Sequence, residues 1–251
     1  MLQPFISHQF KSSVWRLEID SLTDTIFAEV RSQGDKKVTF SSIGLNNAKV
    51  YFDNIETEER WLTGVEAAYD GVLILHNYLS DSGPAHKGLI AIDGFSVKAL
   101  WSDFNYALDF LSINGPVVFD TRLQPRRLSL IDIKTGAIIR KYEPAIDLEI
   151  TVPICLPAPA ELELTPAFHL PVSPLQNSVR YLDHNNLRIV SLHALTDGIL
   201  RQHLYVMKNI EIIYEDLLNT DIQKLQPESF LLHKDQLIYL KNQSQLKVLN
   251  L

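Results

Sequence analysis

The sequence is poor in cysteine, with a single thiol, Cys155, in 251 residues. One cysteine cannot form an intrachain disulfide, so a reducing compartment is favoured. No apolar run approaches the roughly 20 residues that span a bilayer. The first residues, MLQPFISHQFKSS, also lack the apolar segment of a signal peptide. We therefore predict a cytoplasmic protein without a membrane partner.

Positive charge is not in excess either, because 23 Lys and Arg stand against 30 Asp and Glu, and the net charge is −7. This balance predicts no nucleic-acid partner. A Gly-rich phosphate loop, a G-x-S-x-G elbow, an H-E-x-x-H helix and paired C-x-x-C motifs are all missing from the sequence. These absences leave the function open between a binding module and an enzyme.

A repeated hairpin pattern is the strongest signal that is present. The stretch GLIAIDGFSVKALW, Gly88 to Trp101, reads as a strand, a turn and a returning strand. Four other segments align with it without gaps. In each, an aliphatic residue precedes the anchor and a small hydrogen-bonding residue follows three positions later. The five anchors are Gly44, Asp93, Asp132, His193 and Lys241.

A further pair of strands precedes each hairpin, which gives units of four antiparallel strands. In the fourth and fifth units the first strands are expected at 147–153 and 209–216. Tandem four-stranded units of about 40–50 residues are typical of propeller blades. We predict an all-β, five-bladed β-propeller that forms one domain over 1–251. The expected blades are 14–60, 61–103, 104–146, 147–206 and 207–251, and residues 1–13 are expected to help the ring to close.

The segments IAIDGFSVKALW and SLIDIKTGAIIR resemble the repeat core of quinoprotein-type propellers, which are PQQ-like and WD40-like in architecture. The chain as a whole, with ERWLTGVEAAYDGVLILHNY and HKGLIAIDG, resembles a bacterial family described only as a domain of unknown function. The resemblance implies the fold and no chemistry. None of the calcium or quinone ligands of those dehydrogenases has a match here, so no cofactor is predicted.

One segment departs from the repeat. Residues 153–174 hold six of the twelve prolines, and proline removes a ladder donor and fixes an extended backbone. Such an excursion is either a lid or partner-binding arm, or a tolerated insertion.

Each expected first strand carries one carboxylate flanked by aliphatic residues. Because side chains alternate along a strand, the acids would face the propeller axis if their neighbours pack between blades. Such a ring would bind a hard cation, hold protons, pair with a basic loop or line a hydrated channel. The five channel-lining candidates are Glu18, Glu66, Asp109, Glu149 and Glu211.

A second candidate site lies in the second unit, where a linker and a loop are expected to emerge on one rim. It comprises Arg60, Trp61, Glu66, His76, His86 and Lys87. Two histidines and a glutamate suit a transition metal or a general base. Their spacing matches no metal motif, so no metal is predicted. Arg122, Arg126 and Arg127 of the third unit could bind a carboxylate or phosphate.

These observations favour a non-enzymatic module that binds a protein or a small ligand through its channel mouth and rim loops. The alternative is a hydrolase, of the glycosidase kind, with axial carboxylates. A hydrolase needs two carboxylates at working separation, one of which stays protonated, whereas a binder needs only a groove or a patch.

Overall fold

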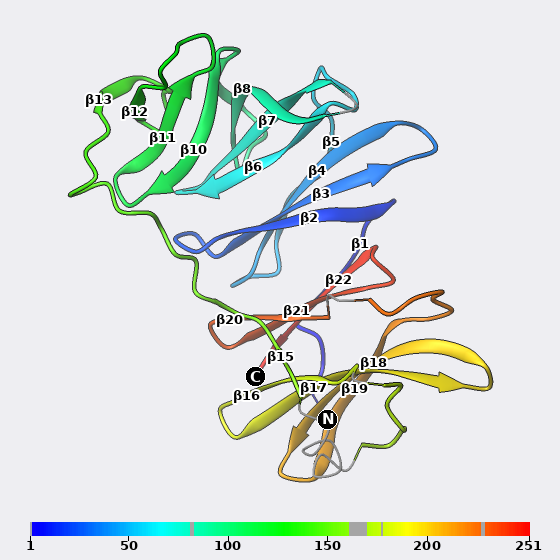
Figure 1. The fold of residues 1–251 in the computed structure, drawn as a ribbon. Coiled ribbons are helices and arrows are strands. Elements are labelled where there is room, and N and C mark those ends of the chain that lie inside the picture. Colours follow the sequence, from blue (N-terminus) through cyan, green and yellow to red (C-terminus); the bar gives the residue numbers. More distant parts are fainter. Residues whose placement is uncertain (1, 81–82, 161–169, 177, 227–228) are drawn as a thin grey trace. The chain divides into compact units, whose positions relative to one another are not determined.

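The computed structural model describes residues 2–80, 83–160, 170–176, 178–226 and 229–251. Within these ranges every regular element is a β-strand (Figure 1). The strands form five antiparallel sheets of four or five strands each, so the predicted all-β class is confirmed. No helix in the described part of the chain is long and apolar enough to cross a membrane.

The strands divide between two compact units. The continuous unit spans Lys11–Val152, and the split unit combines Met1–Phe10 with Pro153–Leu251. Each unit has apolar clusters of its own, so the packing of each can be followed separately.

The continuous unit holds three four-stranded sheets, and in each of them the strands pair in chain order. The first comprises β2 (Ser13–Asp20), β3 (Thr25–Ser32), β4 (Lys37–Gly44) and β5 (Val50–Ile55). The second comprises β6 (Thr63–Tyr69), β7 (Val72–Ser80), β8 (Gly83–Asp93) and β9 (Ala99–Asp103). The third comprises β10 (Tyr106–Ser112), β11 (Gly115–Asp120), β12 (Leu128–Ile131) and β13 (Ile138–Lys141).

The repeated turns have one common geometry in this unit. The anchor N–H donates to the carbonyl five residues later at Gly44, Asp93 and Asp132, over 2.8, 2.8 and 2.9 Å. At both aspartates one carboxylate oxygen also accepts hydrogen bonds from the small residue three positions on, Ser96 or Thr135. The sequence repeat therefore corresponds to one hairpin that recurs in three sheets.

Strand β7 explains how these sheets pack, because its side chains alternate between two apolar clusters. Leu73 and Leu75 lie in a cluster with Phe27 and Phe40 of the first sheet. The intervening Ile74 lies in the cluster that contains residues of the third sheet. The second sheet is therefore buried on both faces, with its neighbours in sequence on either side.

The split unit holds two five-stranded sheets. One, the fourth sheet, runs in the order β15 (Ala158–Pro159), β16 (Arg180–His184), β17 (Leu187–Thr196), β18 (Ile199–Lys208) and β19 (Glu211–Asn219). The other runs in the order β1 (Ile6–Gln9), β22 (Gln245–Asn250), β21 (Gln236–Lys241), β20 (Leu231–His233) and β14 (Ile154–Cys155). Residues from the two ends of the chain thus pair directly, with Ile6 opposite Val248.

Two expectations for the later part of the chain are wrong, one about a strand and one about the sheet to which a strand belongs. The segment 147–153 forms no strand and joins the third sheet by a single bridge, from Glu149 to Ser112. The strand expected to open the fifth unit is β19, which pairs with β18 and ends the fourth sheet. A further antiparallel strand could follow β18 as easily as it could begin a new sheet, so the boundary near 206 was misplaced. The single domain over 1–251 stays a prediction.

The proline-rich excursion is described only in part, because 161–169 lie outside the described residues. Its first residues supply the short strands β14 and β15. Leu170 and Val172, which follow the gap, pack against the cluster that includes Val190 and Tyr205 of the fourth sheet. The described part therefore covers an apolar sheet face, and a lid or partner-binding role stays a prediction.

Candidate functional site

The site begins with an irregularity in β6. Val65 pairs with Leu75 and Ala67 with Ile74 of β7, so Glu66 is an extra residue without a partner in the ladder. A β-bulge of this kind bends the strand and re-aims the side chain at the bulged position. Two other first strands carry bulges at Trp15 of β2 and Asp109 of β10. The bulge is therefore a shared feature of the three sheets, and Glu66 occupies it in the second.

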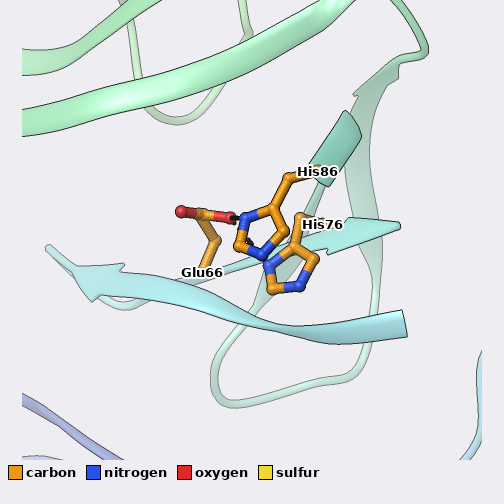
Figure 2. Close-up of side chains that lie close together, drawn as sticks. All are labelled: Glu66, His76 and His86. Carbon is orange, nitrogen blue, oxygen red and sulfur yellow. Dashed lines mark hydrogen bonds and ion pairs between the residues drawn. The ribbon is translucent and has the colours of Figure 1, made fainter. Parts of the chain in front are cut away.

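Two histidines from the neighbouring strands approach Glu66 (Figure 2). His76 lies on β7 opposite Gly64, and His86 lies on β8 opposite Tyr78. Their imidazole rings stack, with centroids 3.5 Å apart and planes inclined by 7°. Tyr78 meets both rings edge-on, at 4.6 Å and 5.1 Å. Adjacent strands thus hold a carboxylate and two imidazoles in one place.

Both histidines contact the same carboxylate oxygen. His86 Nδ1 is hydrogen-bonded to Glu66 Oε2 at 2.9 Å. His76 Nδ1 lies 2.7 Å from that oxygen, but away from the direction of an N–H hydrogen bond. His76 is only 1% exposed, and among the described residues neither of its ring nitrogens has a hydrogen-bond partner. Nδ1 therefore has a carboxylate beside it, whereas the buried Nε2 carries a desolvation cost that no hydrogen bond from the described residues offsets.

The site keeps the glutamate ionised. Burial acts to raise the pKa of Glu66, but the contacts with His76 and His86 outweigh it and lower the pKa below the ordinary value. Burial lowers the pKa of His86, and the neighbouring His76 adds to this effect against the attraction of Glu66. At neutral pH the cluster therefore presents an anionic oxygen and, on His86, a neutral imidazole. Such groups can bind a cation or exchange a proton.

A hollow of about 400 Å³ lies beside the cluster. His86 lines it from β8, and Asp109 at the bulge of β10 lines it from the third sheet. Arg126 lies over the ring of Phe119 with the guanidinium carbon 4.3 Å from the ring centroid, and both residues contribute to the lining. Asp120, also in the lining, is held by Arg122 through bonds of 2.9 and 2.6 Å.

A second hollow, of about 320 Å³, is lined by Trp15, Arg31, Trp61 and Tyr78. The Arg31 guanidinium carbon lies 4.9 Å from the Trp61 ring centroid and 5.8 Å from the other two. Arg31 also donates to Glu29 over 2.6 Å and to two backbone carbonyls. Its polar groups are thus largely engaged within the protein.

The structure joins three of the six residues predicted for the rim site, Glu66, His76 and His86. Trp61 lies instead at the hollow around Arg31. Arg60 and Lys87 are exposed, and the group of metal-type donors found among the described residues consists of Glu66, His76 and His86 without them. The structure thus brings three of the predicted residues together, and a ligand-binding role for the six stays a prediction.

The five channel-lining candidates do not share one structural position. Glu66 and Asp109 sit on bulges, whereas Glu18 lies three residues beyond the bulge of β2. Glu18 is paired with Arg16 over 2.9 Å. Glu149 is exposed outside any strand, and Glu211 is exposed on the last strand of its sheet rather than the first. The expectation of one acid on each first strand therefore fails for the last two.

Sequence reasoning missed two features of this region. It did not place Asp109 and Arg126 at one hollow, which depends on how β10 and the loop after β11 fold together. It also missed the buried pair of Arg31 and Glu29 on β3. Two charged residues spaced by two within the apolar strand TIFAEVR were the only available signal.

Comparisons with known proteins give a family likeness without an activity. A family model described as Domain of unknown function (DUF4905) matches residues 19–101, about a third of the chain. The match includes Glu66, His76 and His86 and confirms the predicted resemblance over these residues. The resemblance to quinoprotein-type repeats stays a prediction. No curated protein matches the chain.

Among solved structures, 69 chains match. One is a bifunctional GH43-CE protein from Bacteroides eggerthii, with 10% sequence identity and a TM-score of 0.27. The match covers 97% of this chain and 36% of that one, so the chain spans little more than a third of that protein's length.

Proposed function

We propose that this protein is a non-enzymatic module that binds a small, neutral, polyhydroxylated ligand, such as a saccharide, in the hollow beside Glu66, His76 and His86. The observation that carries the proposal is the lining of that hollow, which places acceptors and donors side by side. Asp109 supplies a carboxylate and Arg126 a guanidinium, while Asp120 is already paired with Arg122. Because the remaining charges balance, a neutral ligand rich in hydroxyl groups suits the hollow better than an ion does.

We also propose that the five sheets are the blades of one propeller. Three consecutive four-stranded sheets in the continuous unit share two apolar clusters, which is how adjacent blades pack. In such a ring the bulged first strands would carry Glu66 and Asp109 near the channel mouth. A cytoplasmic location and the lack of nucleic-acid and membrane partners stay predictions.

The test is calorimetric titration of the full chain with a panel of neutral, acidic and amino saccharides. We expect a neutral saccharide to bind, and Asp109→Ala to weaken it by about tenfold or more, since one hydrogen bond to a charged group is worth about 1.5–3 kcal/mol. The matched control is Asp183→Ala, another exposed strand carboxylate, paired with Arg188 far from the hollow in sequence. Binding that survives Asp109→Ala, or no binding by any saccharide, would overturn the proposal.

A second candidate is a glycoside hydrolase, favoured by one observation. Burial raises the pKa of Glu18 in spite of Arg16, whereas the histidines lower that of Glu66. Arg16 links the two strands, because it donates to the carbonyls of Val65 and Glu66 at 2.8 and 3.0 Å. Carboxyls with opposite shifts are typical of acid and nucleophile pairs.

Hydrolysis of a chromogenic glycoside distinguishes the candidates. Turnover that Glu18→Gln and Glu66→Gln each abolish would favour the hydrolase, whereas binding without turnover favours the module. The contact of Arg16 with Glu18 supports the module, because it stabilises the ionised carboxylate that a general acid must avoid.

A further inference from the structure

The buried imidazole of His76 is the starting point for a second assignment. Its two nitrogens have no hydrogen-bond partner among the described residues, although the side chain is 1% exposed. Native proteins rarely leave buried polar atoms unsatisfied, and each exception needs an explanation. A ligand of the imidazole provides one.

The surrounding groups indicate the kind of ligand. Glu66, His76 and His86 each offer one donor atom, and these atoms all lie within 4.8 Å of one another. Two imidazole nitrogens with one carboxylate oxygen are a common set for zinc, and the nitrogen donors disfavour calcium and magnesium. Glu66 and His76 are mostly buried, whereas His86 is about a third exposed at the hollow. The three donors would leave an ion with a coordination position to spare.

The stacked rings require a local adjustment. Imidazole lone pairs lie in the plane of the ring, and these two planes are nearly parallel, inclined by 7° with centroids 3.5 Å apart, so one ion cannot lie in both planes. His86 is the ring that can turn, because its side chain is a third exposed and its present contacts are with Glu66 and two aromatic neighbours. His76 is fixed more firmly, because Gly64 packs against its ring. A Cβ at Gly64 would lie only 2.9 Å from His76 Nε2.

We propose that Glu66, His76 and His86 form a transition-metal site of the zinc class, which closes when the His86 ring rotates out of the stack. The metal would occupy the buried donors of His76 and Glu66 and place its remaining coordination position toward the hollow. The assignment does not depend on the saccharide proposed above, because the three donors come from the protein alone. The sequence spacing predicted no metal, since strand pairing rather than chain distance brings these residues together.

The experiment uses the full chain after treatment with a chelator and dialysis. We expect Zn²⁺ to bind with a stoichiometry of one and a Kd of about 1 µM or tighter, in the absence of any saccharide. Ca²⁺ and Mg²⁺ should not compete. X-ray absorption of the zinc complex should show two imidazole nitrogens among the ligands.

Two ligand variants and two controls make the test specific. His86→Ala and Glu66→Gln should each weaken Zn²⁺ binding by more than about 100-fold, with folding checked by circular dichroism. His184→Ala, which removes another histidine paired with a carboxylate, and Cys155→Ser, which removes the exposed thiol, should bind as the parent does. No binding by the parent, equal binding by the ligand variants, or loss only in a control would each overturn the site. None of these results bears on saccharide binding, so the two proposals fail separately.

Discussion

The first two sheets of the continuous unit share a β-bulge in their first strand but place different polar side chains next to it. In each, the first strand has a bulge, at Trp15 or Glu66. The second strand then presents a polar side chain opposite the residue two positions before the bulge, which is Arg31 in one sheet and His76 in the other. The third sheet has Phe119 at the corresponding place.

The difference lies in how completely the polar groups are satisfied. Glu29 accepts from Arg31 at 2.6 Å and from the N–H of Val65 at 2.7 Å, and Arg31 donates to the carbonyls of Trp61 and Thr63. His76 Nδ1 lies 2.7 Å from Glu66 Oε2 outside hydrogen-bond geometry, and its Nε2 has no hydrogen-bond partner among the described residues. A buried ion pair whose hydrogen-bonding groups are all satisfied has a structural role. A buried imidazole whose nitrogens lack hydrogen bonds indicates that a ligand binds there.

The largest expected effect comes from breaking the saturated pair. Arg31→Ala leaves Glu29, 2% exposed, without its counter-charge, and should lower the free energy of unfolding by about 3–5 kcal/mol. Denaturant unfolding measures it. The control is Lys37→Ala on β4, whose ion pair with Glu56 is partly exposed and should contribute less than about 1 kcal/mol. Equal losses in the two variants would contradict the structural role of Arg31.

An intermediate effect is expected at Gly64. A Cβ there would lie 2.9 Å from His76 Nε2 and 3.2 Å from Glu29 Oε2, so Gly64→Ala presses on both sites at once. We expect a loss of about 1–3 kcal/mol and a displaced His76 ring, followed by imidazole NMR signals. Gly34→Ala, where nothing lies within 4 Å, should change stability by less than about 0.5 kcal/mol. If the imidazole NMR signals of His76 do not shift in Gly64→Ala, the added methyl group does not press on the His76 ring and the prediction is wrong.

A smaller effect is expected for His76→Leu. The variant removes a buried Nε2 that has no hydrogen-bond partner among the described residues, but it also removes the contact of Nδ1 with Glu66, so the unfolding free energy should change by less than about 1 kcal/mol in metal-free protein. His193 is a buried histidine whose Nε2 accepts from the N–H of Gln226 at 3.0 Å, although its Nδ1 has no hydrogen-bond partner among the described residues. His193→Leu should therefore destabilise, and a similar loss in both variants would remove the contrast between satisfied and unsatisfied groups.

The smallest effect is a pH dependence at a third buried pair. Hydrogen bonds from Arg140 hold the pKa of Asp147 well below its usual range, helped by the N–H of Glu143 and by Asn114. A depressed carboxyl pKa contributes stability that is present above the unfolded value near 3.9 and is lost as pH falls through the folded one. Thermal unfolding should show Asp147→Asn losing stability at pH 7 and flattening the acid limb. A parallel acid limb in both proteins would exclude Asp147 as its source.

The sequence predicted the fold best where local chemistry dictates it. The Asp70–Gly71 and Asp197–Gly198 turns adopt the positive φ angles that such hairpins need, and the aspartate anchors form the expected turns. It failed at the segment 147–153, where the alternation of a strand is visible but no strand forms, and it assigned β19 to the wrong sheet, although β19 pairs with β18 across a short turn. Strand pairing at long range depends on packing that a periodicity does not encode.

The same distinction applies to the site. Glu66, His76 and His86 could be grouped because a hairpin returns β8 beside β7, and hairpin register follows from turns. The hollow at Asp109 and the saturation of Arg31 depend on contacts between sheets. No pattern within one strand distinguishes a buried charge that is satisfied from one that is not.

The pairing of β1 with β22 has a consequence for biosynthesis. All residues of the continuous unit emerge from the ribosome in one uninterrupted stretch, and this unit can fold while the rest is still being made. Strand β1 is made before the continuous unit, yet its ladder partner appears about 240 residues later, from Gln245 onward. At a translation rate of 5–20 residues per second, β1 lacks its ladder partner for on the order of ten seconds or more. A nascent chain halted before β22 should therefore hold a folded continuous unit while β1 is still unpaired.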